Sequence, residues 1–413
     1  MLVQFNFENF KSFRDENTLD MTATNIKEHP YNVIEYTTKD RFLKVATIYG
    51  ANASGKSNVI EAFNFMRYFV LNSLAINEDI NRKDDIIPVK SFAFDENKNG
   101  TSLFEVFFIV DNVEYQYGFT VDNKKIYEEW LYSRNLRRKN TTTLFQREDN
   151  SIVCGNKMKD AEKFIESVDD KTLFLTLTAK TNVKVSKIVF KWFLDSFVID
   201  FGDSIFEAYI SNFLSNEIVT DELYKKKVEE FLIAIDTGIK GIRIEEIKDD
   251  KKNKYRIFAK HSTKTGEMVE IPFEEESSGT IKMFCLFNFF LKALDNGTPL
   301  FIDELNAKLH PLLVRYIINM FHDPNINKKN AQLIFTTHDV STLTKDVFRR
   351  DEIWFTEKDE EGVSTLFSLV EYRLEDNSKV RNDATYNKDY LSGRYGAIPI
   401  LREFNILEDL NGK

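Results

Sequence analysis

The residues that most constrain the fold are Gly50–Ser57, whose sequence GANASGKS fits the phosphate-loop pattern of a glycine, four variable residues and Gly-Lys-Ser. The apolar segment Phe42–Tyr49 precedes this loop and is typical of a buried strand. A helical pattern begins at Ser57 and continues to about Asn72. A strand, a glycine-containing loop and a helix in this order form the phosphate-binding unit of α/β proteins, so the sequence predicts a parallel sheet.

The predicted loop has the groups that a nucleotide phosphate requires. Backbone N–H groups and the N-terminus of the following helix supply a fixed positive potential. Lys56 can reach the β- and γ-phosphates, and the hydroxyl of Ser57 can bind Mg²⁺. We therefore expect the nucleotide to be bound by Gly50, Asn52, Ala53, Ser54, Gly55, Lys56, Ser57 and Asn58.

A pair of carboxylates follows another apolar segment, far along the chain. Pro299–Ile302 has the character of a buried strand, and Asp303 and Glu304 stand where that strand would end. Asp303 can support Mg²⁺, while Glu304 can polarise the attacking water as a general base. Aspartate–glutamate pairs are common at solvated strand ends. The phosphate loop makes the catalytic interpretation the better one.

A serine-glycine turn at a predicted helix start forms a second candidate anion site. Its residues are Ser277, Ser278 and Gly279, and the apolar helix Ile281–Phe287 follows them. Such a turn presents a hydroxyl and free N–H groups to an anion. A plain helix cap is the simpler interpretation of this turn. Only the presence of the other motifs favours an anion-binding site.

A single histidine follows the apolar strand Gln332–Thr336. The imidazole of His338 can contact a γ-phosphate there and report its presence. A lone histidine at a strand end is usually structural, but its place after Asp303 and Glu304 favours a role in the reaction. We expect the catalytic residues to be Glu304, His338 and Lys56.

The order of predicted elements divides this α/β chain into three parts. Residues 1–150 contain the phosphate loop and, over Ile87–Phe145, short alternating segments typical of an antiparallel sheet. Residues 151–270 have mainly helical patterns and a hairpin around Asp249–Lys254. Residues 271–413 return to buried strands between helices. The sequence thus predicts a phosphate-loop core split between the two ends of the chain, with an antiparallel β subdomain and a mainly helical insertion.

The charge and hydropathy of the chain limit its binding to nucleic acid and to membranes. A net charge of −10 argues against nonspecific coating of nucleic acid, so only a local basic patch can bind it. Two basic clusters are candidates for such a patch: Arg134, Arg137, Arg138 and Lys139, and Lys180, Lys184 and Lys187. Clusters of charged residues are more often solvated surfaces. The first residues lack the pattern of a signal peptide, and no run of about 18 apolar residues occurs. We expect a cytoplasmic protein without membrane contact.

In chain order, the phosphate loop, the serine-glycine turn, the carboxylate pair and the histidine resemble the ABC-type ATPase heads of the RecF, SMC and OLD kind. A narrower similarity covers both ends of the chain. The segments that resemble bacterial AAA ATPases of abortive-infection and restriction-linked loci, such as the RloA-like and AbiL-like proteins, are Asn9–Phe13, Asp303–Pro311, Arg350–Lys358 and Gly393–Pro399.

This resemblance implies an enzyme that uses ATP and Mg²⁺ and hydrolyses ATP slowly. It also implies a head-to-tail homodimer or a higher homo-oligomer, in which the phosphate loop of one subunit and Ser277–Gly279 of another enclose ATP. The family carries a glutamine-bearing loop before its helical region, and the sequence leaves Gln116 and Gln146 as alternatives. His310 stands where transporter relatives have an acid.

A complete set of nucleotide motifs without an effector domain favours a sensor or scaffold. We expect the protein to control a separately encoded effector, such as a TOPRIM-like nuclease or a toxin, in antiphage defence by abortive infection. The main alternative is a RecF-like DNA-binding clamp for repair or recombination. A structural hub that turns ATP over very slowly is a third hypothesis.

Overall fold

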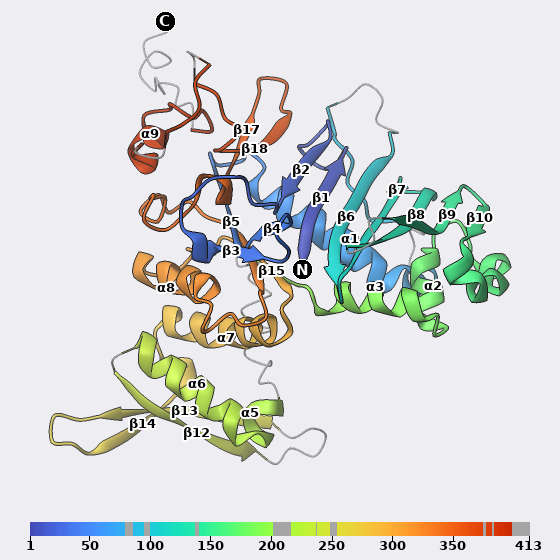
Figure 1. The fold of residues 1–413 in the computed structure, drawn as a ribbon. Coiled ribbons are helices and arrows are strands. Elements are labelled where there is room, and N and C mark those ends of the chain that lie inside the picture. Colours follow the sequence, from blue (N-terminus) through green and yellow to red (C-terminus); the bar gives the residue numbers. More distant parts are fainter. Residues whose placement is uncertain are drawn as a thin grey trace, which may run out of the picture.

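The structure is a computed structural model that describes residues 1–78, 86–94, 100–136, 140–200, 216–236, 238–247, 254–374, 377–381 and 384–398. The described residues form an α/β fold with a six-stranded, mostly parallel sheet, a seven-stranded antiparallel sheet and two smaller sheets (Figure 1). The predicted fold class is confirmed. Within the described ranges, no helix is long and apolar enough to span a membrane.

The six-stranded sheet combines strands from both ends of the chain. Its order is β11 (Phe197–Asp200), β15 (Pro299–Asp303), β16 (Gln332–Thr336), β5 (Val45–Gly50), β17 (Ile353–Lys358) and β18 (Ser364–Ser368). The strands from β11 to β17 are parallel, and β18 pairs antiparallel with β17. Every residue of β15, β16 and β5 is buried, as expected of parallel strands whose two faces are covered.

Helices cover both faces of this sheet. α1 (Lys56–Glu78) lies on one face, where Phe63 stacks on Phe301 of β15 with 3.9 Å between ring centroids. α7 (Ser278–Asn296) and α8 (Pro311–His322) belong to the core on the other face, which includes Leu300 and Ile302. Alternate residues of one strand thus enter two separate hydrophobic cores.

The seven-stranded sheet includes the N-terminal strands. Its order is β10 (Ser151–Cys154), β9 (Thr141–Glu148), β8 (Ile126–Asn135), β7 (Val113–Val121), β6 (Ser102–Val110), β1 (Leu2–Glu8) and β2 (Asn17–Asp20). Asp111 and Asn112 both have positive φ and connect β6 to β7 in a two-residue hairpin. α2 (Phe174–Lys180) and α3 (Lys184–Asp195) pack against the sheet, with Trp192 stacked on Phe108. The predicted antiparallel sheet is confirmed.

A smaller unit lies beside α7. In it, α5 (Asn216–Thr220) and α6 (Glu222–Ile235) precede a three-stranded sheet of β12 (Ile239–Ile247), β13 (Lys254–Ser262) and β14 (Met268–Pro272). Phe231 of α6 stacks on Phe287 of α7 with 4.0 Å between ring centroids. The predicted hairpin is confirmed, and its connection, residues 248–253, lies outside the described residues. Figure 1 shows this unit below α7, away from the seven-stranded sheet.

Two segments differ from the sequence prediction. The single strand expected over 42–49 is divided into β4 (Arg41–Leu43), which pairs with β3 (Val33–Glu35), and β5, which enters the parallel sheet. Lys44 at the junction is buried, and its ammonium donates to the His322 carbonyl at 2.9 Å. The range 151–270, expected to be mainly helical, also contains β11, which pairs with β15.

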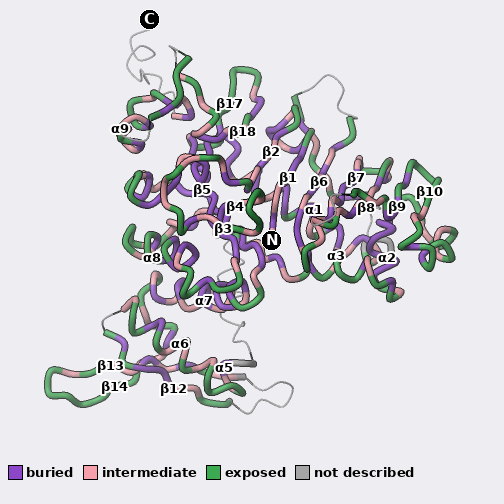
Figure 2. The backbone as a smooth tube through the Cα atoms, in the orientation of Figure 1, coloured by how far each residue is buried: buried purple, intermediate pink, exposed green. Residues whose placement is uncertain are grey.

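The remaining elements are short. They are the 3-10 helices η1 (Pro30–Asn32), η2 (Asn156–Ser167), η3 (Phe273–Glu275) and η4 (Arg350–Glu352), and the helix α9 (Tyr386–Leu391). Figure 2 shows that the central strands of the six-stranded sheet are buried, whereas buried and more exposed residues alternate along the seven-stranded sheet and the tip of the β13–β14 hairpin is exposed. The protected interior therefore lies around β5, where the phosphate loop begins.

Candidate nucleotide-binding site

The loop Gly50–Ser57 connects the end of β5 to α1, as its sequence pattern requires. Ala53 and Gly55 have left-handed backbone conformations, with φ of 63° and 109°. A Cβ atom on Gly50 would be 2.6 Å from the carbonyl oxygen of Thr356 in β17. The first glycine is therefore required by close contact and the second by conformation. The loop ends at a helix N-terminus, whose unpaired N–H groups favour an anion.

The loop has an exposed tip and a buried base. Asn52 and Ala53 are exposed, and Ser57 is half-buried at the start of α1. Ser54 is buried, and its hydroxyl shares a hydrogen bond of 2.6 Å with Thr356. The base of the loop is thus fixed to β17, while its tip faces solvent.

Lys56 is buried and closes the loop on itself. Its ammonium donates to the carbonyl oxygens of Gly50 at 2.9 Å and Ala51 at 2.7 Å. Burial lowers the pKa of Lys56 to about 8, against an opposing influence from the nearby carboxylates of Asp303 and Glu304. The lysine therefore lies within electrostatic range of both predicted acids.

Thr336 organises the carboxylate pair, although sequence reasoning missed it. Asp303 is the buried last residue of β15, and its carboxylate accepts a hydrogen bond from the Thr336 hydroxyl in β16. The same hydroxyl accepts from the backbone N–H of Glu304 at 2.8 Å. Glu304 has a positive φ of 52°, uncommon for a residue with a side chain. The chain therefore turns at Glu304, directly after Asp303 ends β15.

His338 lies in the same electrostatic environment. The backbone N–H of His338 and the hydroxyl of Thr337 both donate to the side-chain oxygen of Asn306, at 3.2 and 3.0 Å. Partial burial and the charge of Lys56 lower the pKa of His338, while Glu304 and Asp303 oppose this shift. The fold thus brings Lys56, Asp303, Glu304 and His338 together at the carboxyl edge of the parallel sheet.

The segment Asn9–Phe13 is a turn that contacts the start of α1. The hydroxyl of Ser12 accepts hydrogen bonds from Asn58 at 2.7 Å and from Ser364 at 2.8 Å. A Cβ atom on Gly55 would be 2.8 Å from the Ser364 hydroxyl, so these residues enclose the loop. The pairing of residue 12 with residue 364 has no local sequence signal.

Lys11 of the same turn extends toward the carboxylates. It forms an ion pair with Glu61 of α1. Burial and Lys90 lower the pKa of Lys11, and the charges of Asp200 and Asp303 oppose that shift. Asp200 ends β11 and is in register with Asp303 on the neighbouring strand. A cavity of about 660 Å³ is lined by Lys11, Lys90 and Asp200, so space adjoins this edge.

The serine-glycine turn begins α7, as predicted. Ser277 caps the helix by accepting from the backbone N–H of Thr280 at 3.1 Å. A Cβ atom on Gly279 would be 3.1 Å from the carbonyl oxygen of Lys308, in the loop that follows the carboxylate pair. Among the described residues, no hydrogen bond or ion pair joins this turn, including Ser278, to the phosphate loop.

The two candidate glutamines bond within the antiparallel sheet. The amide of Gln116 donates to Glu105 at 2.7 Å, and that of Gln146 donates to the Tyr132 hydroxyl at 2.6 Å. Neither side chain has a hydrogen bond to the phosphate loop. The polar residues that end the strands on either side of Asp303 are Asp200 of β11 and Thr336 of β16.

The basic clusters are only partly described. Arg134 forms a bidentate pair with Glu114, with distances of 2.9 and 2.8 Å, which neutralises its charge. Arg137, Arg138 and Lys139 lie outside the described residues. Lys180, Lys184 and Lys187 are exposed on α2 and α3, as is Lys191, which forms an ion pair with Asp195 at 2.5 Å.

The phosphate loop, the carboxylates at the end of β15 and the histidine after β16 are features of a phosphate-loop ATPase domain. The chain belongs to the family described as "AAA domain, putative AbiEii toxin, Type IV TA system", whose model matches residues 45–344. No curated protein matches the chain.

Solved structures with a similar arrangement include two Smc head domains. One, from Pyrococcus furiosus, has an extended coiled coil and is bound to the C-terminal domain of ScpA; it is 12% identical, with a TM-score of 0.39. The other, from Pyrococcus yayanosii, has a coiled coil and joint; it is 13% identical, with a TM-score of 0.43. Each match covers 89% of this chain and 96% of the other.

Proposed function

We propose that this chain binds ATP with Mg²⁺ and hydrolyses it slowly. The observation that carries the proposal is the convergence of Lys56, Asp303, Glu304 and His338 beside the phosphate loop. Ser57 and Asp303 would hold Mg²⁺, because hydroxyl and carboxylate oxygens are ligands that this ion prefers. The bound ion would neutralise charge on the phosphates.

The reaction assigns a different task to each side chain. The Lys56 ammonium exchanges its two carbonyl partners for phosphate oxygens, which are stronger acceptors. Glu304 accepts a proton from the attacking water, and its backbone turn, fixed by Thr336, aims the carboxylate. His338 contacts the γ-phosphate, and Asn306 holds its backbone in place.

A second copy of the chain completes the site in this proposal. The turn Ser277–Gly279 presents a helix N-terminus but has no hydrogen bond to its own phosphate loop in the described part of the chain. Its contact with Lys308 places it beside the loop that follows Glu304. Two copies arranged head to tail would bring this turn over the phosphates of the other copy.

The biological role that we propose is that of an ATP-dependent sensor or scaffold in abortive infection, acting on a separate effector such as a TOPRIM-like nuclease or toxin. The support is the family, which is described through AbiEii and a toxin–antitoxin system. The alternative, a RecF-like clamp on DNA, is favoured only by the exposed lysines of α2 and α3.

A complementation experiment tests the shared site. Lys56→Ala should lose nucleotide binding, and Ser277→Arg should retain binding but lose turnover. A mixed dimer rebuilds one site from the intact halves, so equal mixing should restore about a quarter of wild-type turnover. If both variants remain inactive when mixed, the head-to-tail site is wrong.

The catalytic base is tested separately. Glu304→Gln should bind ATP, stop turnover and accumulate dimers measured by light scattering. Glu361→Gln changes an exposed carboxylate with 74% side-chain exposure and should behave as wild type. Normal hydrolysis of ATP by Glu304→Gln would contradict the assignment of Glu304 as the general base.

The ATP-bound dimer of Glu304→Gln also distinguishes the two biological roles. Salt-dependent binding of DNA by this dimer would favour the RecF-like clamp, whereas copurification with a nuclease or toxin would favour the role in abortive infection.

A further inference from the structure

The smaller unit beside α7 contacts the serine-glycine turn through a histidine. His261 lies in β13, the central strand of this unit, where it pairs with Ile239 of β12 and Val269 of β14. Its ring Nε2 atom is 2.6 Å from the carboxylate of Glu276. Because a carboxylate only accepts hydrogen bonds, Nε2 is the donor. The residue directly before Ser277 is therefore bonded to the middle of the three-stranded sheet.

The carboxylate before the turn and the serines within it differ in exposure. The side chain of Glu276 is only 8% exposed, whereas Ser277 and Ser278 are exposed. A Cβ atom on Gly238 would be 3.3 Å from Nδ1, the other ring nitrogen of His261, so the ring lies between Gly238 and Glu276. The histidine thus holds the carboxylate away from solvent and leaves the two serines at the surface.

A second contact with the smaller unit lies on the other side of the turn. The hydroxyl of Thr280 donates to the carboxylate of Asp236, at the end of α6, at 2.9 Å. The backbone N–H of Gly238 donates to the same carboxylate at 2.9 Å, which holds it beside the start of β12. The turn Ser277–Gly279 therefore stands between two residues, Glu276 and Thr280, that are both bonded to the smaller unit.

Loss of the histidine would change both the position and the charge of the turn. A carboxylate without a partner is costly to bury, so the Glu276 side chain would rotate toward water. Its charge would then lie beside the N-terminus of α7, where it would compete with a phosphate for the free N–H groups. Without His261, the turn would lose one of its two bonds to the unit and would also bind an anion less well.

We propose that His261 is a positioning residue for the turn Ser277–Gly279, and that the smaller unit controls the joining of two copies through it. This rests on the proposed function, in which the turn covers ATP held by the other copy. His261 should therefore affect the assembly of two ATP-bound copies and not the capture of ATP by one copy.

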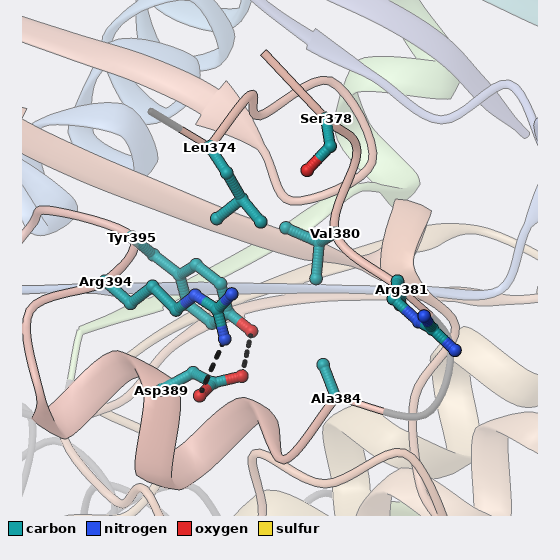
Figure 3. Close-up of a pocket in the computed structure, with 8 residues that line it drawn as sticks. All are labelled: Leu374, Ser378, Val380, Arg381, Ala384, Asp389, Arg394 and Tyr395. Carbon is teal, nitrogen blue, oxygen red and sulfur yellow. Dashed lines mark hydrogen bonds and ion pairs between the residues drawn. The ribbon is translucent and has the colours of Figure 1, made fainter. Parts of the chain in front are cut away.

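The test uses the full chain with Glu304→Gln, which should accumulate ATP-bound dimers. His261→Leu removes the donor to Glu276, whereas His261→Gln retains one, because a glutamine amide nitrogen can replace Nε2. Tyr395→Phe is the control, because it also removes one hydrogen bond to a carboxylate, that of Asp389 in α9 at 3.0 Å (Figure 3). The measurements are light scattering against ATP concentration, the Kd of ATP for the single chain in dilute solution, and the melting temperature without nucleotide.

We expect His261→Leu to raise the ATP concentration for half-maximal dimer formation about fivefold, and to change the Kd of ATP for the single chain less than about twofold. His261→Gln and Tyr395→Phe should both form dimers within about twofold of the parent concentration.

Three outcomes would overturn the proposal. They are unchanged dimer formation by His261→Leu even with a lower melting temperature, an equal loss of dimers in His261→Gln, and a rise in the Kd of the single chain as large as the rise for dimer formation. Failure of the Glu304→Gln parent to form dimers with ATP would instead overturn the head-to-tail site of the proposed function.

Discussion

At the scale of single residues, the protonation of Lys56 should govern nucleotide affinity. Burial holds its pKa at about 8, so the free protein loses this charge as the pH rises through that value. Phosphate oxygens favour the charged form. Above pH 8, binding must therefore take up a proton, and the Kd of ATP should rise by up to about tenfold per pH unit.

Lys56→Arg provides the comparison, because a guanidinium stays charged throughout this range. A titration of Kd between pH 7 and 9.5 should show a steep rise for the wild type and a flat profile for Lys56→Arg. A parallel rise in both proteins would mean that another group controls the pH dependence. The sign follows from the lowered pKa: affinity is retained below pH 8 and lost above it.

At the scale of elements, the smaller unit holds the start of α7 through one carboxylate. Asp236, at the end of α6, accepts a hydrogen bond from the Thr280 hydroxyl at 2.9 Å. A carboxylate can only accept, so the Thr280 proton points to Asp236, and the Ser277 hydroxyl must donate to Thr280. The charge and this orientation both oppose an anion at the turn Ser277–Gly279.

Asp236→Asn should therefore favour ATP-driven dimerisation. Removing one negative charge near the helix N-terminus should lower the ATP concentration for half-maximal dimer formation by roughly two- to fivefold. The measurement is light scattering in the Glu304→Gln background. Asp221→Asn is the control, because Asp221 caps α6 in the same unit, away from this turn, and asparagine caps equally well. A weaker dimer in Asp236→Asn would show that the carboxylate supports the turn.

The parts predictable from sequence are those with a local pattern. The apolar strands β15 and β16 are each followed by polar residues, and this pattern alone indicates Asp303, Glu304 and His338. The strand β11 has only four residues in a range of helical patterns, so periodicity could not reveal it. Its pairing with β15 brings together residues about 100 positions apart, so no local pattern predicts it.

Residues that support the site were missed for a related reason. Thr336 and Asn306 act through hydrogen bonds to groups about thirty positions away, and Ser12 bonds to Ser364 across most of the chain. Serine, threonine and asparagine are common in loops, where they carry no distinctive signal.

At the scale of the whole molecule, Gln332 links the N-terminal sheet to the parallel sheet. Its fully buried amide accepts from the Leu2 N–H at 2.6 Å and donates to the carbonyl oxygens of Leu2 and Leu43, both at 3.0 Å. Gln332→Leu would leave these backbone groups buried without partners. We expect the free energy of unfolding to fall by about 2–4 kcal/mol.

Urea unfolding, followed by both fluorescence and circular dichroism, measures this loss. Gln146→Leu, at an exposed position with one hydrogen bond, should change stability by less than about 0.5 kcal/mol. If Gln332→Leu is as stable as the control, the link between the sheets contributes little. Two separate transitions in Gln332→Leu would show that the sheets unfold independently.

The position of β5 between β16 and β17 also affects biosynthesis. The strand leaves the ribosome early, but its neighbours β16 and β17 follow about 290 and about 310 residues later, which at common rates of synthesis takes roughly 15 to 60 s. Until then the phosphate loop has no sheet to support it. We therefore expect a chain that ends before β17 not to bind nucleotide, because its phosphate loop lacks one of the two strands that flank β5.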